Sequence, residues 1–230
     1  VTAKLIHAAT DSLLWARDYE RDLTDVLKLQ SDVARAVADE IRIQVTPEER
    51  ARLASARNIN PQAHEGYLLG QYHLSKNNEQ DMNQAINCFE RAIQTGPNYP
   101  RAYAGLSAAL LQRGWVITAG AMYKGVESQS RSAALKAIAL DEQLAEGHSS
   151  LGRIKLLYDW DWASAEQELK RALELDPGSV DAHIYYGHLL SFLRRDQEAI
   201  HEGQIAVQLD PLSSTTQSSL GQCHFRARKY

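Results

Sequence analysis

The chain has 230 residues, and its 25 Lys and Arg against 29 Asp and Glu give a formal net charge of −4. Hydrophobic residues make up 44% and charged residues 23%, which is ordinary for a folded globular protein. An acidic balance argues against a nucleic-acid-binding surface, which needs a basic face. The sequence also has no apolar run near the roughly 18 residues that a membrane-spanning helix needs.

The two cysteines and the chain ends bear on the compartment. Cys88 and Cys223 lie far apart in helical patterns, so we expect buried free thiols rather than a disulfide. The chain starts at Val1 without a signal-peptide pattern and stops at Tyr230 inside a half-built repeat, so we expect a fragment of a longer protein. Free thiols favour a reducing compartment, so we expect the cytoplasm. If the parent protein has an upstream membrane span, we expect the periplasm instead.

Residues 1–22 have the pattern of a β-hairpin. The Asp11-Ser12 dipeptide is a turn signal between two runs that carry β-branched or aromatic residues. In the second run Leu13, Trp15 and Arg17 share one face of an extended strand. An isolated hairpin is marginally stable in water, so we expect it to pack on the following helix or on strands outside this sequence.

Two helices are predicted between the hairpin and the rest of the chain. Residues 23–45 have apolar side chains at three- and four-residue spacing, which predicts an amphipathic helix. Thr46 as N-cap, Pro47 at the first helical position and Glu49 three residues after the cap predict a second helix, which ends near Arg57.

Residues 163–211 repeat their own pattern after 34 residues. The positions that recur are Ala165, Ala172, Leu175, Asp176 and Pro177, as Ala199, Ala206, Leu209, Asp210 and Pro211. This is the period of the tetratricopeptide repeat (TPR), in which helix A and helix B form an antiparallel pair. Small residues seven apart on one face of helix B allow close packing, and the residue before proline is pushed out of the α region, which ends helix B.

The repeat extends in both directions, so we expect a mostly α fold, a right-handed TPR α-solenoid after the short N-terminal hairpin and helix. Repeat one is expected near residues 61–97, repeat two from residue 100 to 141, repeat three at 144–177 and repeat four at 180–211, followed by helix A of a fifth repeat. Gly152, Gly187 and Gly221 recur at helix A positions, where we expect the closest approach to helix B. Glycine inside a helix costs about 1 kcal/mol relative to alanine, which favours a packing role.

Repeat two contains an insert from Trp115 to Glu127. We interpret it as a longer connection packed by Trp115, Met122 and Tyr123. The alternative is a recognition loop, because long loops in compact arrays are often functional.

Two stretches resemble a known family beyond the repeat itself. Residues 5–41, beginning LIHAATDSLLWARDYERDL, resemble the end of the TolB-like domain that precedes TPR arrays in certain bacterial regulators, and YDWDWASAEQELKRALELDP at 158–177 resembles a phrase common in those arrays. The resemblance implies an upstream effector, either a winged-helix DNA-binding domain or an adenylate or guanylate cyclase. It implies that residues 1–45 are the C-terminal hairpin and helix of a TolB-like α/β domain, 46–60 a connecting helix and turn, and 61–230 the TPR array.

The chemistry-bearing residues are better explained by packing than by catalysis. His148 and His183 fall at the fourth position of helix A, and His73 and His224 near the eleventh, where TPR helices place packing residues. Asp161 is expected to cap helix B of repeat three, with Trp160 and Trp162 packed at the turn. We find no Gly-rich phosphate loop, no triad and no converging ligand set, and expect no enzymatic activity, no cofactor and no metal.

The concave face of the array is the candidate binding site. Helix A residues that point away from helix B line it: Tyr67, Gln71, Arg101, Glu146, Arg153, Asp181, Ile184, Tyr185, His188, Phe192, Gln222 and Arg226. We expect apolar Ile184, Tyr185 and Phe192 on a nominally exposed surface, and arginines able to pair with acidic groups of a peptide or partner helix. The Lys and Asn set of TPR domains that grip a peptide C-terminus is not reproduced.

Two functions follow as hypotheses. The first is a non-enzymatic interaction, scaffold or sensor module of a bacterial regulator, which binds a protein or peptide in the concave groove and binds no nucleic acid. The second is a homodimerisation module, favoured by the exposed hairpin edge and by Leu220 and Cys223 on the inner side of the last helix.

Overall fold

The computed structural model describes residues 2–7, 12–18, 32–33, 36–37, 59–117 and 125–227. They belong to two compact units, Val1–Glu65 and Gly66–Tyr230. The helices predicted at 23–45 and 46–57 fall almost wholly outside the described residues. Met122 and Tyr123 of the insert and the side chain of Trp115 also lie outside them.

The first unit contains the predicted hairpin, which is confirmed. Strand β1 (Thr2–His7) pairs antiparallel with β2 (Ser12–Asp18). The register is irregular: Leu5 lies opposite Trp15, whereas Ile6 lies opposite Leu13. Leu14 therefore has no residue directly opposite it, and the simple alternation expected along β2 is interrupted at this bulge.

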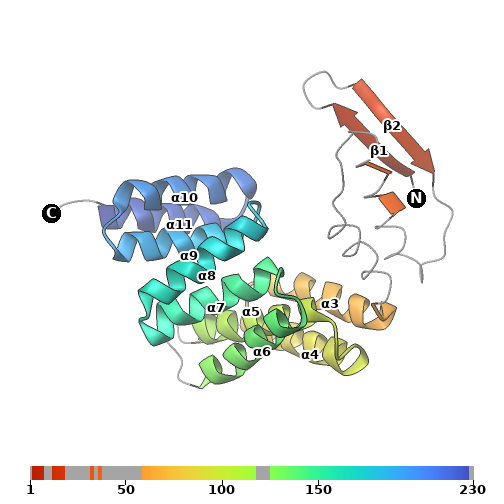
Figure 1. The fold of residues 1–230 in the computed structure, drawn as a ribbon, viewed down its shortest axis with the longest axis horizontal. Coiled ribbons are helices and arrows are strands. Elements are labelled where there is room, and N and C mark those ends of the chain that lie inside the picture. The colour runs from red at the N-terminus through yellow and green to blue at the C-terminus, as the bar shows by residue number, and fades with distance from the viewer. Residues whose placement is uncertain are drawn as a thin grey trace. The chain divides into compact units, whose positions relative to one another are not determined.

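The helices of the array follow in order along the chain. They are α3 (Pro61–Leu74), α4 (Glu79–Thr95), α5 (Pro100–Ile117), α6 (Val126–Leu140), α7 (Ala145–Ile154), the π-helical turn η3 (Lys155–Asp159), α8 (Trp162–Leu175), α9 (Val180–Phe192), α10 (Asp196–Leu209) and α11 (Ser214–Ala227). Figure 1 shows α3 to α10 as successive antiparallel pairs, with α11 packed beside α9 and α10. The predicted TPR α-solenoid is confirmed.

Small residues on the B helices form the core that the period predicts. Ala165 and Ala172 on α8 are fully buried, as are Ala199 and Ala206 on α10. A Cβ added to Gly152 on α7 would lie 2.7 Å from Leu169 Cγ, so glycine permits this close approach.

Phe89 of α4 makes a second close contact between repeats. Its ring is fully buried, and a Cβ built on Gly70 of α3 or Gly105 of α5 would lie 2.6 or 2.4 Å from Phe89 Cε1. Because real Cβ atoms do not approach this closely, the ring fits between the two helices only where each carries glycine. Helices α3 and α5, the A helices of repeats one and two, therefore both pack against Phe89 of α4, the B helix of repeat one.

The B helices end in one repeated way. The backbone N–H groups of Gly96, Asp141, Asp176 and Asp210 each donate to the carbonyl of an alanine four residues earlier, at 2.9–3.0 Å. Asp176 is extended and Asp210 also lies outside the α region, as expected of residues before proline. Asp141 is extended although Glu142 follows it, so the turn forms without proline as well.

Helix A of the third repeat departs from the pattern. It ends in the π-helical turn η3, which was not predicted, and Trp160 after it has a left-handed φ of 57°. Asn77 and Arg194 have left-handed φ values at the equivalent turns, two residues before α4 and α10. Such a conformation costs a non-glycine residue about 1–2 kcal/mol, so it persists here because packing on both sides of each turn imposes it.

One expectation about the last helix is wrong, and a second is wrong for one of its two residues. A Cβ on Gly221 would meet nothing within 4 Å, because the described residues contain no B helix after α11. Cys223 is 1% exposed and lies against Gly187 of α9, so it is not available to a second molecule, whereas Leu220 packs against Gly203 of α10 and is half-buried. Among the described residues, the large apolar side chains exposed near this end are Leu209, Leu212 and Phe225.

Candidate partner-binding groove

Three overlapping cavities of about 600, 480 and 220 Å³ form a continuous groove along the A helices. Arg153, Ile184 and Tyr185 line both the first and the second cavity, and Gln71 and Asp181 line both the second and the third. Each of the twelve residues predicted for the concave face lines at least one of these cavities. The sequence spacing therefore places them along one surface.

A row of rings on α9 forms one wall of the largest cavity. Tyr185, His188 and Phe192 lie on the same face of the helix, three and four residues apart. The Tyr185 and His188 rings meet edge to face at 6.0 Å, and Phe192 stacks on Trp162 of α8 with ring centroids 6.0 Å apart. We call Tyr185, His188 and Phe192 the α9 ring row.

A guanidinium group covers each end of the α9 ring row. Arg153 from α7 lies 4.7 Å from the centroid of Tyr185, and Arg226 from α11 lies 4.3 Å from the centroid of Phe192. Cation–π contacts of this kind fix the direction of a long side chain. Arg153 also donates from Nη2 to the Gln112 Oε1 at 3.4 Å.

Burial and these charges shift the ionisation of the groove residues. Burial, with the charges of Arg226 and Arg153, lowers the pKa of His188 to about 4, so its ring is neutral at pH 7. Burial raises the pKa of Tyr185 to about 12. Asp181 is exposed to water in the groove. Desolvation by the surrounding protein still raises the pKa of its carboxyl, and this outweighs the lowering caused by the charge of Arg153.

The serine–histidine contact in this cavity is a poor match to the nucleophile and base of a hydrolytic site. Ser219 Oγ lies 3.0 Å from His188 Nε2, the geometry of a nucleophile and base. However, Ser219 is only 2% exposed, and an imidazole whose pKa is near 4 is a weak base at neutral pH. The pair is better suited to fixing the orientation of the ring.

The far end of the groove is more polar. Arg101 and Glu146 approach to 3.9 Å with about half of each side chain exposed, so this ion pair contributes little to stability. Tyr67 lines the same cavity, and burial raises the pKa of its hydroxyl.

Two groove residues are more buried than expected. Ile184 is 4% exposed and Arg153 is 7% exposed. Treating the helix A positions as a nominally exposed surface was therefore wrong for both. The physical reason is that α9 packs against α7 and α11 as well as α10, and these helices cover the faces that the repeat pattern leaves open.

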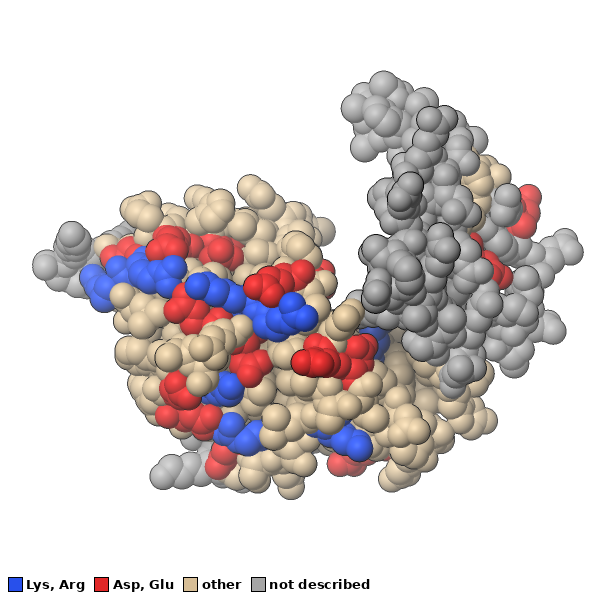
Figure 2. All heavy atoms as spheres, in the orientation of Figure 1, with Lys and Arg blue, Asp and Glu red and all other residues tan. Residues whose placement is uncertain are grey.

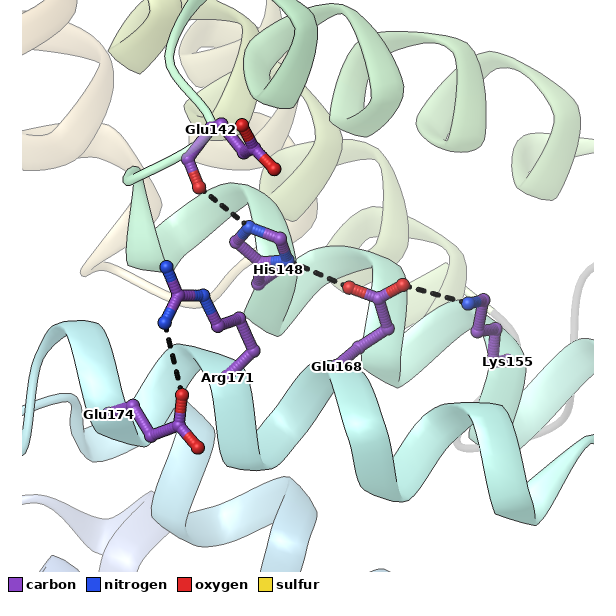
Figure 3. A network of polar contacts seen from close by, with 6 residues as sticks. All are labelled: Glu142, His148, Lys155, Glu168, Arg171 and Glu174. Carbon is purple, nitrogen blue, oxygen red and sulfur yellow. Dashed lines mark hydrogen bonds and ion pairs between the residues drawn. The ribbon is translucent and has the colours of Figure 1, made fainter.

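Two buried histidines link helix A to helix B instead of lining the groove. His148 of α7 lies 2.8 Å from the carboxylate of Glu168 on α8 and 3.0 Å from the carbonyl oxygen of Glu142 (Figure 3). His183 of α9 repeats this arrangement, with Glu202 at 2.6 Å and the Pro177 carbonyl at 3.0 Å. The packing interpretation of both histidines is confirmed.

Both ring nitrogens of each histidine face an acceptor, which favours the protonated ring. The hydrogen bond with Glu168 raises the pKa of His148. Burial alone would lower the pKa of His183, but Glu202 and the Pro177 carbonyl outweigh it and the pKa is raised. We call the two contacts the His–Glu pairs. These contacts were not predicted from the sequence, although the histidines recur after 35 residues and the glutamates after 34.

The bond to the backbone carbonyl recurs at the fourth position of helix A with other side chains. The Tyr103 hydroxyl donates to the Pro97 carbonyl at 3.1 Å, and the Gln217 amide donates to that of Pro211 at 3.2 Å. The position therefore selects a donor of suitable length rather than histidine itself.

Three further expectations have different outcomes. Asp161 accepts from the Ser164 N–H at 3.1 Å, which confirms it as the N-cap of α8, and this hydrogen bonding lowers the pKa of its carboxyl. His224 was expected in a packing position and is exposed. Trp162 is half-buried at the turn, whereas Trp160 is 61% exposed and lines the largest cavity.

Acidic and basic side chains are intermixed on the face of the array seen in Figure 2. Within the described residues, no three His, Cys, Asp or Glu side chains converge as metal ligands would. No helix in the described part of the chain has the length and apolar character to span a bilayer.

Comparison with known proteins places the fold and gives distant relatives. No protein-family model matches the chain. A putative adenylate cyclase of Rhizobium meliloti is 28% identical over 111 residues, which cover 48% of this chain and 19% of that protein. The transcriptional regulator HilA of Salmonella typhimurium is 27% identical over 148 residues, covering 63% of this chain and 26% of that protein. The chain thus spans a minor part of the length of the curated relatives it matches.

Solved structures show the same fold at low identity. A thermophilic TPR protein of Thermus thermophilus superposes with a TM-score of 0.56 at 19% identity, covering 88% of this chain and 97% of that one. PilF of Pseudomonas aeruginosa gives a TM-score of 0.51 at 15% identity, covering 72% of this chain and 68% of that one.

Proposed function

We propose that the array is a non-enzymatic interaction module of a larger bacterial regulatory protein, and that its groove holds a peptide or helix of a partner protein. The observation that carries this proposal is the groove itself: three overlapping cavities, lined by aromatic rings and arginines from successive A helices. Aromatic and arginine side chains are the residues that most often anchor a protein partner.

The two relatives are named for different activities, which supports a role for this segment that does not depend on either activity. One is named as an adenylate cyclase and the other as a transcriptional regulator, and each resembles this chain over a minor part of its length. A segment similar to parts of both fits a shared role in binding or sensing. In this proposal residues 1–45 are the end of a TolB-like domain, 46–60 connect it to the array, and the parent protein acts in the cytoplasm.

A site-specific photo-crosslink tests the groove. A benzophenone amino acid at Gln222, exposed in the groove, should crosslink a defined protein in lysate of the source organism. The matched control carries the crosslinker at Lys136, which is exposed on α6 outside the three cavities. Purified partner should then lose affinity for a Tyr185→Ala variant of unchanged melting temperature. Equal crosslinking from both positions, or none from Gln222, would refute groove binding.

Self-association is the second candidate, favoured by the apolar residues exposed near α11. Leu212 is 96% exposed and Phe225 is 60% exposed, and apolar groups of this size on a surface are typical of protein contacts. Sedimentation velocity over a wide concentration range tests it. A Phe225→Ser variant should weaken any dimer, and a strict monomer at all concentrations would exclude this function.

A further inference from the structure

The largest cavity of the groove contains two cations that form no ion pair with any described residue, although the charge of Arg153 acts on the Asp181 carboxyl at longer range. Among the described residues, neither Arg153 nor Arg226 has a carboxylate within ion-pair distance. Two other half-buried cations of the array do have one: Lys155 lies 2.8 Å from Glu168, and Arg195 lies 2.7 Å from Glu166. The two groove arginines therefore lack the carboxylate partner that Lys155 and Arg195 have.

Part of their hydrogen-bonding capacity is also unused, although Arg153 Nη2 donates to Gln112 Oε1. Arg153 is 7% exposed, and its Nε is buried without a partner within the described part of the chain. The Nη1 atom of Arg226 is buried and unpartnered in the same way. Leaving a buried charged donor unsatisfied is costly, so the free chain carries a cost that an anion in this cavity would remove.

The other residues that line the cavity determine which chemical groups can lie beside the anion. Both guanidinium charges act on His188, which lies between the two other rings of the α9 ring row and is neutral at pH 7. Leu156, Ile184 and Trp160 add apolar surface. Gln112 Nε2 donates to Asn77 Oδ1 at 2.8 Å, and the remaining N–H groups and lone pairs of these two amides suit an extended backbone. The site fits a singly charged, planar group next to apolar atoms better than a fully hydrated ion.

We propose that this cavity binds a side-chain carboxylate of an acidic partner segment between Arg153 and Arg226, with a neighbouring apolar side chain of that segment on Tyr185 and Phe192. The inference rests on the proposed function and names the chemistry of the partner. The planar fork of a guanidinium matches a carboxylate in charge and geometry. The cation–π contacts with Tyr185 and Phe192 hold both forks in place before binding, which lowers the cost of ordering them.

Selection from a display library of random peptides with blocked ends tests the composition. The wild-type chain should enrich peptides in which Asp or Glu adjoins an aliphatic or aromatic residue. An Arg153→Met, Arg226→Met variant keeps the apolar stems and should lose that enrichment. The matched control is Arg171→Met, which removes an exposed arginine on α8 outside the cavity. Equal acidic enrichment by the double variant would overturn the inference.

Affinity measurements on the selected peptide complete the test. Replacing its acidic residue by the corresponding amide should weaken binding to wild type about tenfold or more, because a charge-assisted hydrogen bond is lost. The same replacement should change little for the double variant, whose melting temperature is checked separately. A phosphoserine twin that binds more tightly than the acidic peptide would assign the site to phosphate and overturn the inference.

The two proposals can fail separately. Enriched peptides that lack acidic residues but are lost on Tyr185→Ala would leave groove binding intact and refute the carboxylate. No enrichment by any peptide would count against both.

Discussion

The His–Glu pairs predict a stability that falls as the pH rises above neutrality. Each histidine has a pKa raised above its unfolded value of 6.5. A group of this kind contributes its full stabilisation below the unfolded pKa and loses it as the pH rises through the higher folded pKa. On deprotonation one ring nitrogen becomes an acceptor that faces an acceptor, so each pair keeps one of its two hydrogen bonds.

The size of the effect follows from the bonds that change. A hydrogen bond to a charged group contributes about 1.5–3 kcal/mol, against about 0.5–1.5 kcal/mol for a neutral one. Deprotonation should therefore lower the free energy of unfolding by about 1 kcal/mol per pair, and by about 2 kcal/mol for both pairs. Both histidine side chains are at least nine-tenths buried, so solvent screening takes little from this value.

The chain itself supplies the control substitution. Gln217 makes the same fourth-position bond to a backbone carbonyl, so glutamine at positions 148 and 183 should keep that bond without a titrating group. Urea unfolding followed by circular dichroism, at about pH 6 and about pH 8.5, should show a loss of stability in wild type that is absent from the His148→Gln, His183→Gln variant. Equal pH dependence in the two proteins would refute this assignment.

Three further changes test the packing, each by thermal or urea unfolding. Gly105→Ala should cost about 1–3 kcal/mol by overpacking against Phe89, whereas Gly221→Ala should be neutral or stabilising by up to about 1 kcal/mol, and equal effects would contradict the close contact. Leu169→Ala should cost about 2–5 kcal/mol, because this fully buried side chain leaves a cavity; a loss below about 1 kcal/mol would show that the site collapses freely. Asp161→Ala should cost about 0.5–2 kcal/mol through the lost N-cap while Asp161→Asn keeps most of it, and an equal cost for both would contradict capping.

The parts of the fold set by the 34-residue period could be predicted from the sequence. Ala165 and Ala172 are buried because a close helix pair admits only small residues there, and the same spacing places the twelve concave-face residues along one groove. Gly152 contacts Leu169 for the same reason, whereas Gly221 has no following helix to meet among the described residues.

Features that depend on the partner helix could not be read from one helix pattern. The burial of Arg153 arises from α9, and its cation–π contact with Tyr185 joins residues more than thirty positions apart. The π-helical turn at Lys155–Asp159 has no distinct residue pattern, since the apolar spacing of the preceding helix continues through it. In the sequence the histidines recur after 35 residues and the glutamates after 34. That each histidine contacts a glutamate could be recognised only once the pairing of helix A with helix B was known.

The position of Phe89 has a consequence for how the array unfolds. In a linear array, total stability divides into a term for each repeat and a term for each junction between neighbours. Each His–Glu contact joins the two helices of one repeat and so contributes to the intrinsic stability of repeat three or four, while the second bond of each histidine reaches back to the turn before that repeat, at Glu142 or Pro177. Phe89 joins α3, α4 and α5 and belongs to the junction term. A smaller side chain there should broaden the unfolding transition, because the first repeat could then open while the second stays folded.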